Sequence, residues 1–186
     1  MHIKITNVCS KIHLNRNVLL SDIVNFFPDA CSVGQKKTGP IKFKSIQIKL
    51  SQFSGNAMVS LNGVIIIVGS DSIESAQEFA LFLFTVLGGN RPAKFSVSNI
   101  ASTVYTPFKI QLDKFFVYTR GEVDDKSNIT YEPERCNCVQ VKSIYGLAKI
   151  YSTGNMVITG SRSEKDSLET MKLALIFIDD YYRYVY

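Results

Sequence analysis

Two cysteines that stand two residues apart are the first side chains whose types and spacing suggest chemistry. Cys136 and Cys138 lie in the segment "ERCNCVQV", and a Cys-x-Cys pair can hold a soft metal ion or form a redox couple. A structural zinc site generally needs four ligands, however, and neither His2 nor His13 stands at a spacing typical of a metal site or a nucleophile–base pair. We therefore predict no metal, no cofactor and no enzymatic activity, and we interpret both cysteines as strand residues.

The composition bounds the class of protein. A chain of 186 residues with 46% hydrophobic and 20% charged residues is typical of a folded globular domain. Its longest apolar stretch, residues 79–87, is far shorter than the ~20 residues that span a bilayer, so no membrane is expected as a partner. No secretory signal is expected either, because the start "MHIKITNV" already alternates like a strand, and this fits reduced thiols inside a cell. The net charge of +5 permits an anionic partner such as nucleic acid, but it fits a solvated lysine-rich surface equally well.

The chain contains two copies of one pattern. The segments "NGVIIIVGSD" (62–71) and "TGNMVITGSR" (153–162) share two glycines in the same register, 91 residues apart. Asn7 and Asn99, each inside an alternating stretch, are 92 residues apart. A solenoid needs more than two copies, so we expect one pseudo-symmetric domain. Its two repeats are predicted to be residues 1–90 and 91–186.

Each copy is predicted to contain a strand, a short helix, three strands and a long helix. The predicted strands are 3–8, 43–50, 57–61 and 64–69 in the first copy, and 95–101, 137–143, 147–151 and 155–160 in the second. The predicted short helices are 18–27 and 110–119.

The long helices carry cap and stripe signals. Asp71, followed by Glu74, predicts the N-cap of the first, and Ser163-x-x-Asp166 predicts the start of the second. The first helix, residues 72–87, is apolar around most of its circumference, which predicts either a deeply buried helix or a dedicated protein partner. The apolar stripe of the second, predicted to lie on the sheet, is Leu168, Met171, Leu175 and Ile178.

One predicted face of the strands is polar. In residues 43–50 the isoleucines alternate with Phe43, Gln47 and Lys49, and the second copy repeats the pattern with Gln140 and Lys142. If both long helices cover the apolar side, the other side of the sheet is open. Amides, cations and an occasional aromatic ring suit nucleic acid, although an ordinary solvated face fits as well.

Three segments resemble the TATA-box-binding protein family. "RPAKFSVSNIAST" (91–103) resembles the family's junction between repeats, and "YEPE" (131–134) and "STGNMVITGSRSE" (152–164) resemble its second repeat. The resemblance runs from Ile3 to about Tyr182. It implies an α+β saddle in which two pseudo-symmetric repeats form a curved ten-stranded antiparallel sheet with four helices on the convex side.

The resemblance also implies a function. The chain would be a general transcription initiation factor that binds the minor groove of AT-rich promoter DNA and recruits a transcription factor IIB-type partner and RNA polymerase. Its location would be the nucleus, or a cytoplasmic factory if the chain is viral. Two alternatives remain open: a protein-docking scaffold or heterodimer subunit with weak or no DNA binding, and an RNA-binding sheet module.

The site residues that follow are carried over from the resemblance. Asn7 and Asn99 would hydrogen-bond the acceptors of central A·T pairs, with Thr159 close by and Val68 as its counterpart without a hydroxyl. The expected DNA face also includes Gln47 and Gln140. The residues at phosphate-directed positions are Lys49, Lys142 and Arg162, and Asp71 stands opposite Arg162 in the first copy.

The aromatic wedge positions depart from the family, which drives four phenylalanines into base steps. Here these positions read Phe43 and Ser60 in the first copy, and Cys136 and Tyr151 in the second. Each lost wedge removes apolar contact that offsets unstacking, a cost of a few kcal/mol. The loss predicts a shallower kink, weaker intrinsic DNA binding or heavier reliance on partners.

A second surface is implied at residues 131–135, the segment that docks transcription factor IIB in the family. Glu132 and Glu134 are present, while Arg135 replaces a leucine. We therefore expect Tyr131, Glu132, Glu134 and Arg135 to face a partner, with part of the apolar contact changed.

Overall fold

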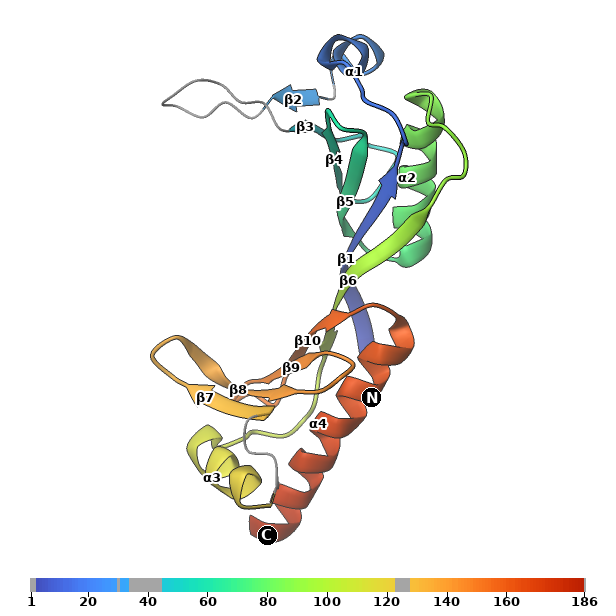
Figure 1. The fold of residues 1–186 in the computed structure, drawn as a ribbon. Helices are drawn as coiled ribbons and strands as arrows, with labels where there is room; N and C mark the ends of the chain where they lie inside the picture. Colours follow the sequence, from blue (N-terminus) through green and yellow to red (C-terminus); the bar gives the residue numbers. More distant parts are fainter. Residues whose placement is uncertain (1–2, 30, 34–44, 123–127, 186) are drawn as a thin grey trace. The chain divides into compact units, whose positions relative to one another are not determined.

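The computed structural model describes residues 3–29, 31–33, 45–122 and 128–185 (Figure 1). Phe43 lies outside these residues. Within them the chain forms ten strands and four helices. In order they are β1 (Ile3–His13), α1 (Leu20–Phe26), β2 (Cys31–Val33), β3 (Ser45–Ile48), β4 (Asn56–Ser60), β5 (Val64–Ser70), α2 (Ile73–Val86), β6 (Phe95–Val104), α3 (Leu112–Glu122), β7 (Ile129–Glu132), β8 (Cys136–Lys142), β9 (Leu147–Ile150), β10 (Met156–Ser161) and α4 (Glu164–Val185).

The strands form one sheet in the order β2-β3-β4-β5-β1-β6-β10-β9-β8-β7, which confirms the ten strands that the resemblance implies. The alternation of residues predicted only four strands in each copy. It missed β2 and β7, the short strands at the two ends of the order. The chain divides into two compact units, residues 6–98 and residues 1–5 with 99–186.

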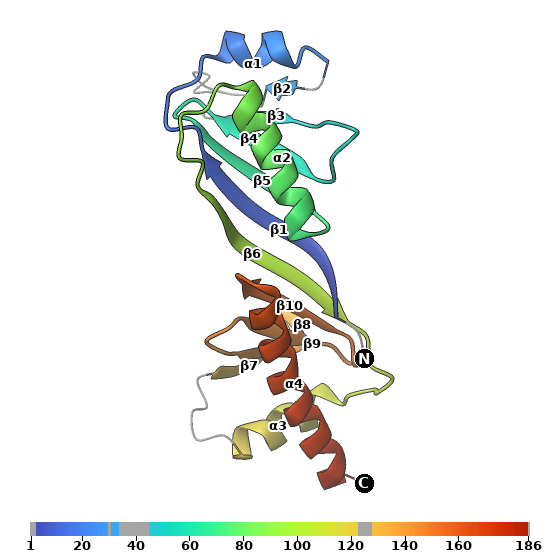
Figure 2. The same ribbon diagram turned by 90° about the vertical axis from the view of Figure 1, so that its right-hand side faces the viewer.

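In the unit of residues 6–98, α2 packs on β5 (Figure 2). The apolar face predicted for residues 43–50 is confirmed where the structure describes it, because Ile46 and Ile48 are buried and Gln47 between them is exposed. Each strand therefore turns alternate side chains toward the helix. The buried residues of α2 that meet them are Ala76, Phe79, Ala80, Leu83 and Phe84.

The N-cap of α2 corrects one prediction. Ser72 has an extended backbone, and its hydroxyl accepts a hydrogen bond from the backbone N–H of Ser75 at 3.0 Å. Asp71, the predicted cap, instead accepts a hydrogen bond from the Ser54 hydroxyl at 3.0 Å. Serine and aspartate both cap helices well, so the residue type alone does not decide which of two neighbours is the N-cap. The backbone conformation decides it.

The apolar circumference of α2 is largely covered within its own unit. Phe82 has ring contacts with Phe27 at 6.4 Å and with Phe53 at 5.2 Å. Phe53 also stacks on Phe79 at 4.7 Å. Leu81 is 39% exposed. These contacts favour the buried-helix interpretation of residues 72–87 over a dedicated partner.

In the other unit, α4 packs on β10 and β9, and α3 packs between α4 and the strands β7 and β8. The predicted cap is confirmed, because Ser163 Oγ accepts from the N–H of Asp166 at 3.1 Å. The predicted stripe is wrong at Leu168, which is 37% exposed. Small residues take the contact with the sheet and let the helix come close; the buried residues of α4 are Ser167, Thr170, Ala174, Ile178 and Tyr181.

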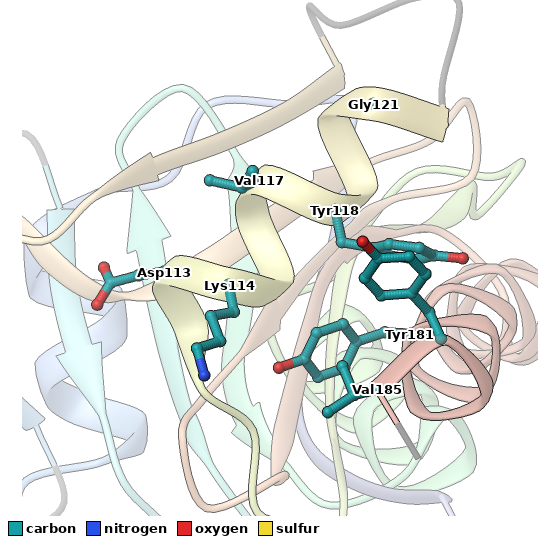
Figure 3. A pocket seen from close by; sticks show the side chains of 8 residues that line it. Asp113, Lys114, Val117, Tyr118, Gly121, Tyr181 and Val185 are labelled. Carbon is teal, nitrogen blue, oxygen red and sulfur yellow. The ribbon is translucent and has the colours of Figure 1, made fainter.

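The outer ends of α3 and α4 enclose an apolar hollow of about 520 Å³. Figure 3 shows Tyr118 and Val117 on α3 and Tyr181 and Val185 on α4 around it. Beneath it, Phe115 meets Tyr181 edge to face at 5.4 Å. This hollow lies between helices, so it is separate from the strand face described next.

Candidate nucleic-acid interface

The open face consists of the strand residues that alternate with the buried core residues. In the unit of residues 6–98 they are Asn7, Cys9 and Lys11 on β1, Ser45 and Gln47 on β3, Asn56, Met58 and Ser60 on β4, and Val64, Ile66 and Val68 on β5. In the other unit they are Asn99, Ala101 and Thr103 on β6, Thr130 on β7, Cys136, Gln140 and Lys142 on β8, Leu147 and Lys149 on β9, and Val157 and Thr159 on β10. Cys138, which the alternation placed on this face, is buried instead.

The same bulge occurs in both units. The pairing of β1 with β5 shifts between Val8 and Ser10, which leaves Gly69 in the bulge with a φ of 85°. The pairing of β6 with β10 shifts in the same way, and there the bulge glycine is Gly160, with a φ of 82°. Only glycine adopts this left-handed conformation without steric cost, so the two glycines of the sequence repeat mark two equivalent bulges.

Each bulge fixes the orientation of one predicted site residue. The backbone N–H of Gly69 donates to Asn7 Oδ1 at 2.7 Å, and that of Gly160 donates to Asn99 Oδ1 at 2.7 Å. An N–H group can only donate, so the amide oxygen of each asparagine is the atom held by the backbone. The amide nitrogens keep two N–H donors each, and no hydrogen bond from them is found in the described part of the chain.

Thr159 and Val68 occupy the same place in the two bulges. Each precedes its bulge glycine, and each is half-buried on the open face. The asparagine and the bulge glycine are hydrogen-bonded in both units, and this third residue is the glycine's neighbour in the chain. The difference between them is one hydroxyl group, present in Thr159 and replaced by a methyl group in Val68.

A row of side chains crosses the open face of the second unit. Thr130 pairs with Gln140, Gln140 with Lys149, and Lys149 with Val157. Gln140 and Lys142, both predicted for this face, line a hollow of about 450 Å³ together with Thr130, Leu147 and Gly160. The sequence analysis missed Lys149, although its alternation with the buried Ala148 and Ile150 was a usable signal.

The unit of residues 6–98 places Gln47 in a comparable row. Gln47 pairs with Met58, Met58 with Ile66, and Ile66 with Lys11. Lys11 was also missed. Ser60, one of the altered wedge positions, pairs with Ser45, so small hydroxyl side chains stand where the family has a ring.

The remaining wedge positions of the second unit lie together. Tyr151 is half-buried and lines a hollow of about 440 Å³ with Thr103, Val157 and Tyr105. Burial, followed by the nearby thiols of Cys138 and Cys136, raises the pKa of Tyr151 above its ordinary value. Tyr105, which the sequence analysis missed, is 66% exposed and adds a second aromatic ring at this end.

The residues at the phosphate-directed positions reach solvent. Lys49, Lys142 and Arg162 are all exposed. Asp71, which stands in the first copy where Arg162 stands in the second, is held by the Ser54 hydroxyl. The cationic charge at this position is therefore present in one unit and replaced by an anion in the other.

The predicted partner segment is the tip of the β7–β8 hairpin, with its turn at residues 133–135. Arg135 Nη1 lies 2.9 Å from Glu132 Oε2, and their side chains are 82% and 53% exposed. The Tyr131 ring contacts Phe116 at 5.8 Å. Burial, followed by the charge of Asp113 and a hydrogen bond to it, raises the pKa of Tyr131.

Among the described residues, no three histidine, cysteine or acidic side chains gather as metal ligands. No helix in the same residues combines the length and the apolar character needed to cross a membrane.

Comparison with known proteins agrees with this geometry. The family model described as "Transcription factor TFIID (or TATA-binding protein, TBP)" matches residues 94–181. The TATA-box-binding protein of Thermococcus sibiricus is 21% identical over 188 residues, which cover 97% of this chain and 95% of that protein. The solved structure of Methanococcus jannaschii TBP has the same fold, with a TM-score of 0.73, 19% identity, and coverage of 97% of this chain and 99% of that one. Residues 94–181 thus match the TATA-binding protein family model, and nearly the whole chain has the fold of a TATA-binding protein.

Proposed function

We propose that the chain binds the minor groove of AT-rich promoter DNA through its open face and acts in transcription initiation. One observation carries this proposal: the two asparagines hold their amide oxygens on a backbone N–H and keep their donors free. The minor-groove edges of A·T pairs offer only the acceptors N3 and O2, so free donors are the complementary group. The match of residues 94–181 to the TATA-binding protein family model and the similarity to the Thermococcus TATA-box-binding protein support it.

The rest of the open face fits the same groove. Apolar side chains such as Ile66, Met58 and Val157 share this face with polar ones, and minor-groove proteins combine apolar contact with amide donors. The exposed Lys142 and Arg162 supply charge for the phosphates. The proposal needs no catalytic group, and the place of action is wherever promoter DNA lies; a nuclear location stays a prediction.

The finer part of the proposal concerns partners. We propose that the β7–β8 hairpin tip docks a transcription factor IIB-type protein, through which RNA polymerase is recruited. Glu134 is exposed and offers an acidic contact, while the ion pair between Arg135 and Glu132 weakens the acidic character of the other carboxylate. Because rim charges act mainly on the association rate, Glu134→Lys should slow partner binding more than it speeds dissociation.

A protein-docking scaffold is the second candidate function. The observations that favour it are the small side chains at Ser60 and Cys136, and Asp71 in place of a cation, since all three weaken DNA contact. A scaffold of this kind would have the same fold but would not bind the minor groove of DNA.

One titration separates these functions. Labelled AT-rich duplex, GC-rich duplex and single-stranded RNA are titrated by fluorescence anisotropy at several salt concentrations, with and without a factor IIB-type protein. The proposal expects preference for the AT-rich duplex and a steep decline of log K with log salt concentration. Absence of DNA binding with and without the partner would support the protein-docking scaffold. Preference for single-stranded RNA would support an RNA-binding sheet module.

A further inference from the structure

Two thiols touch in β8, that of the partly exposed Cys136 and that of the buried Cys138. The Sγ atoms of Cys136 and Cys138 are 2.9 Å apart, and both cysteines are free. A disulfide needs a separation of about 2.05 Å, so closing the bond requires a movement of less than about 1 Å. Cys9, the other described cysteine with a placed side chain, has no second thiol beside it among the described residues.

A bulge in β8 creates this contact. Tyr131 of β7 pairs with Val139, and the next residue, Glu132, pairs with Cys136. Asn137 and Cys138 are therefore extra residues of β8, inserted opposite two consecutive residues of β7. In a regular strand, side chains two positions apart are held well apart by the extended backbone. The bulge bends the strand and brings the two thiols together.

The pair also stands at a functional position. The resemblance places Cys136 where the family has an aromatic wedge, and Tyr151 is the surviving ring at that end. Val139 pairs with Ile150, so Cys138 and Tyr151, the next positions along the two strands, lie close together. The raised pKa of Tyr151 fits this arrangement. Oxidation of the two thiols would therefore alter β8, the strand next to the Tyr151 ring.

We propose that Cys136 and Cys138 form an oxidisable dithiol, that a low-molecular-weight disulfide such as oxidised glutathione closes it, and that closure weakens DNA binding. The effect on DNA rests on the function proposed above. The existence of the dithiol does not.

The reaction balances as two exchanges. Cys136, the more accessible of the two, loses its proton and attacks one sulfur of glutathione disulfide, whose S–S bond breaks and releases one glutathione as a thiol. Cys138 then loses its proton and attacks Cys136 Sγ, which releases the second glutathione. Two protein thiols are oxidised, one glutathione disulfide is reduced, and the new bond joins Cys136 Sγ to Cys138 Sγ.

Closure should reduce affinity because it holds the bulge in one shape. The ring formed by the disulfide encloses Asn137, so β8 can no longer adjust when Tyr151 meets a base step. We expect the affinity for an AT-rich duplex to fall about threefold or more, and to return when the disulfide is reduced by dithiothreitol.

The chain offers a clean chemical readout. Trypsin cleaves after Arg135 and Lys142, and the peptide of residues 136–142 contains both thiols and no other cysteine. Reduced protein is incubated with oxidised glutathione, digested and weighed by mass spectrometry. The expected peptide has lost two hydrogen atoms and does not react with iodoacetamide. A persistent glutathione adduct on Cys136, or two free thiols, would overturn the dithiol.

DNA binding of the same samples is measured by anisotropy. Cys136→Ser, which cannot close, should bind equally well with and without oxidant, whereas the unaltered protein should bind less tightly after oxidation. Closure without a change in affinity would overturn the regulatory effect. If the reduced protein binds no DNA, the proposed function fails together with that effect, while the peptide mass still decides whether the dithiol exists.

Discussion

Replacing Asn99 by two different residues should separate its role in the fold from its role in the groove. Asn99 Oδ1 accepts the N–H of Gly160 at 2.7 Å, and the amide nitrogen is left to donate. Asn99→Ala removes both functions. Asn99→Asp keeps an oxygen for the Gly160 N–H and replaces the donors by a negatively charged oxygen.

The magnitudes follow from these contacts. Alanine leaves the bulge N–H without its partner, so we expect the free energy of unfolding to fall by about 0.5–1.5 kcal/mol. Aspartate should leave it within about 0.5 kcal/mol of the unaltered protein. In DNA binding, loss of the donors should cost about 1–3 kcal/mol, roughly 5- to 150-fold in Kd. Aspartate should bind still more weakly than alanine, because its charge faces groove acceptors and phosphates.

The decisive result is the order of the variants in two assays. Urea unfolding should rank aspartate close to asparagine and alanine below both, whereas anisotropy with an AT-rich duplex should rank asparagine first, alanine second and aspartate last. Asn7→Ala and Asn7→Asp supply a matched pair at the equivalent bulge. If the two Asn99 variants bind the duplex as tightly as the unaltered protein, the donors do not face the groove and the reasoning is refuted.

Three further predictions concern charge, backbone and pH. Lys142→Gln should lower the slope of log K against log salt by about one if this exposed lysine contacts a phosphate; an unchanged slope would place it elsewhere. Gly154→Ala should destabilise the protein more than Gly160→Ala in urea unfolding, because the added Cβ at residue 154 would lie 1.8 Å from the Phe108 carbonyl oxygen. At Gly160 only the positive φ is strained, which costs about 1–2 kcal/mol. Equal losses of stability would contradict the close packing at Gly154. Burial, a hydrogen bond to Cys136 and that neighbour's charge raise the pKa of Cys138 to about 12 from 9.0, so its contribution to stability is complete below about pH 9 and is lost as the pH rises toward 12. Unfolding titrations should therefore show a steeper alkaline loss in the unaltered protein than in Cys138→Ala.

Much of the fold was predictable from the repeat. The spacing of the glycines and of the asparagines predicted two equivalent copies, and the structure places Gly69 and Gly160 in equivalent bulges. The bulges themselves were not predicted from the sequence. The resemblance then supplied the strand total and the expected groove chemistry.

Other features depend on contacts that a pattern of residue types does not contain. The stripe on α4 was misplaced at Leu168, because Ser167, Thr170 and Ala174 are small and do not register as an apolar face. The extra residues of β8 were invisible for a similar reason. Cys136 and Cys138 fit an alternating strand equally well with or without a bulge, and only the pairing with β7 reveals it.

The paired bulges also bear on the direction in which DNA is read. Both asparagine amides present donors, and A·T and T·A pairs offer the same acceptors in the minor groove, so this pair of residues cannot distinguish one strand from the other. A protein that reads DNA in this way can choose a position along the duplex but not an orientation on it. Orientation must come from residues at which the copies differ, such as Thr159 against Val68 and Arg162 against Asp71. The differences between the two repeats would then set the direction of transcription.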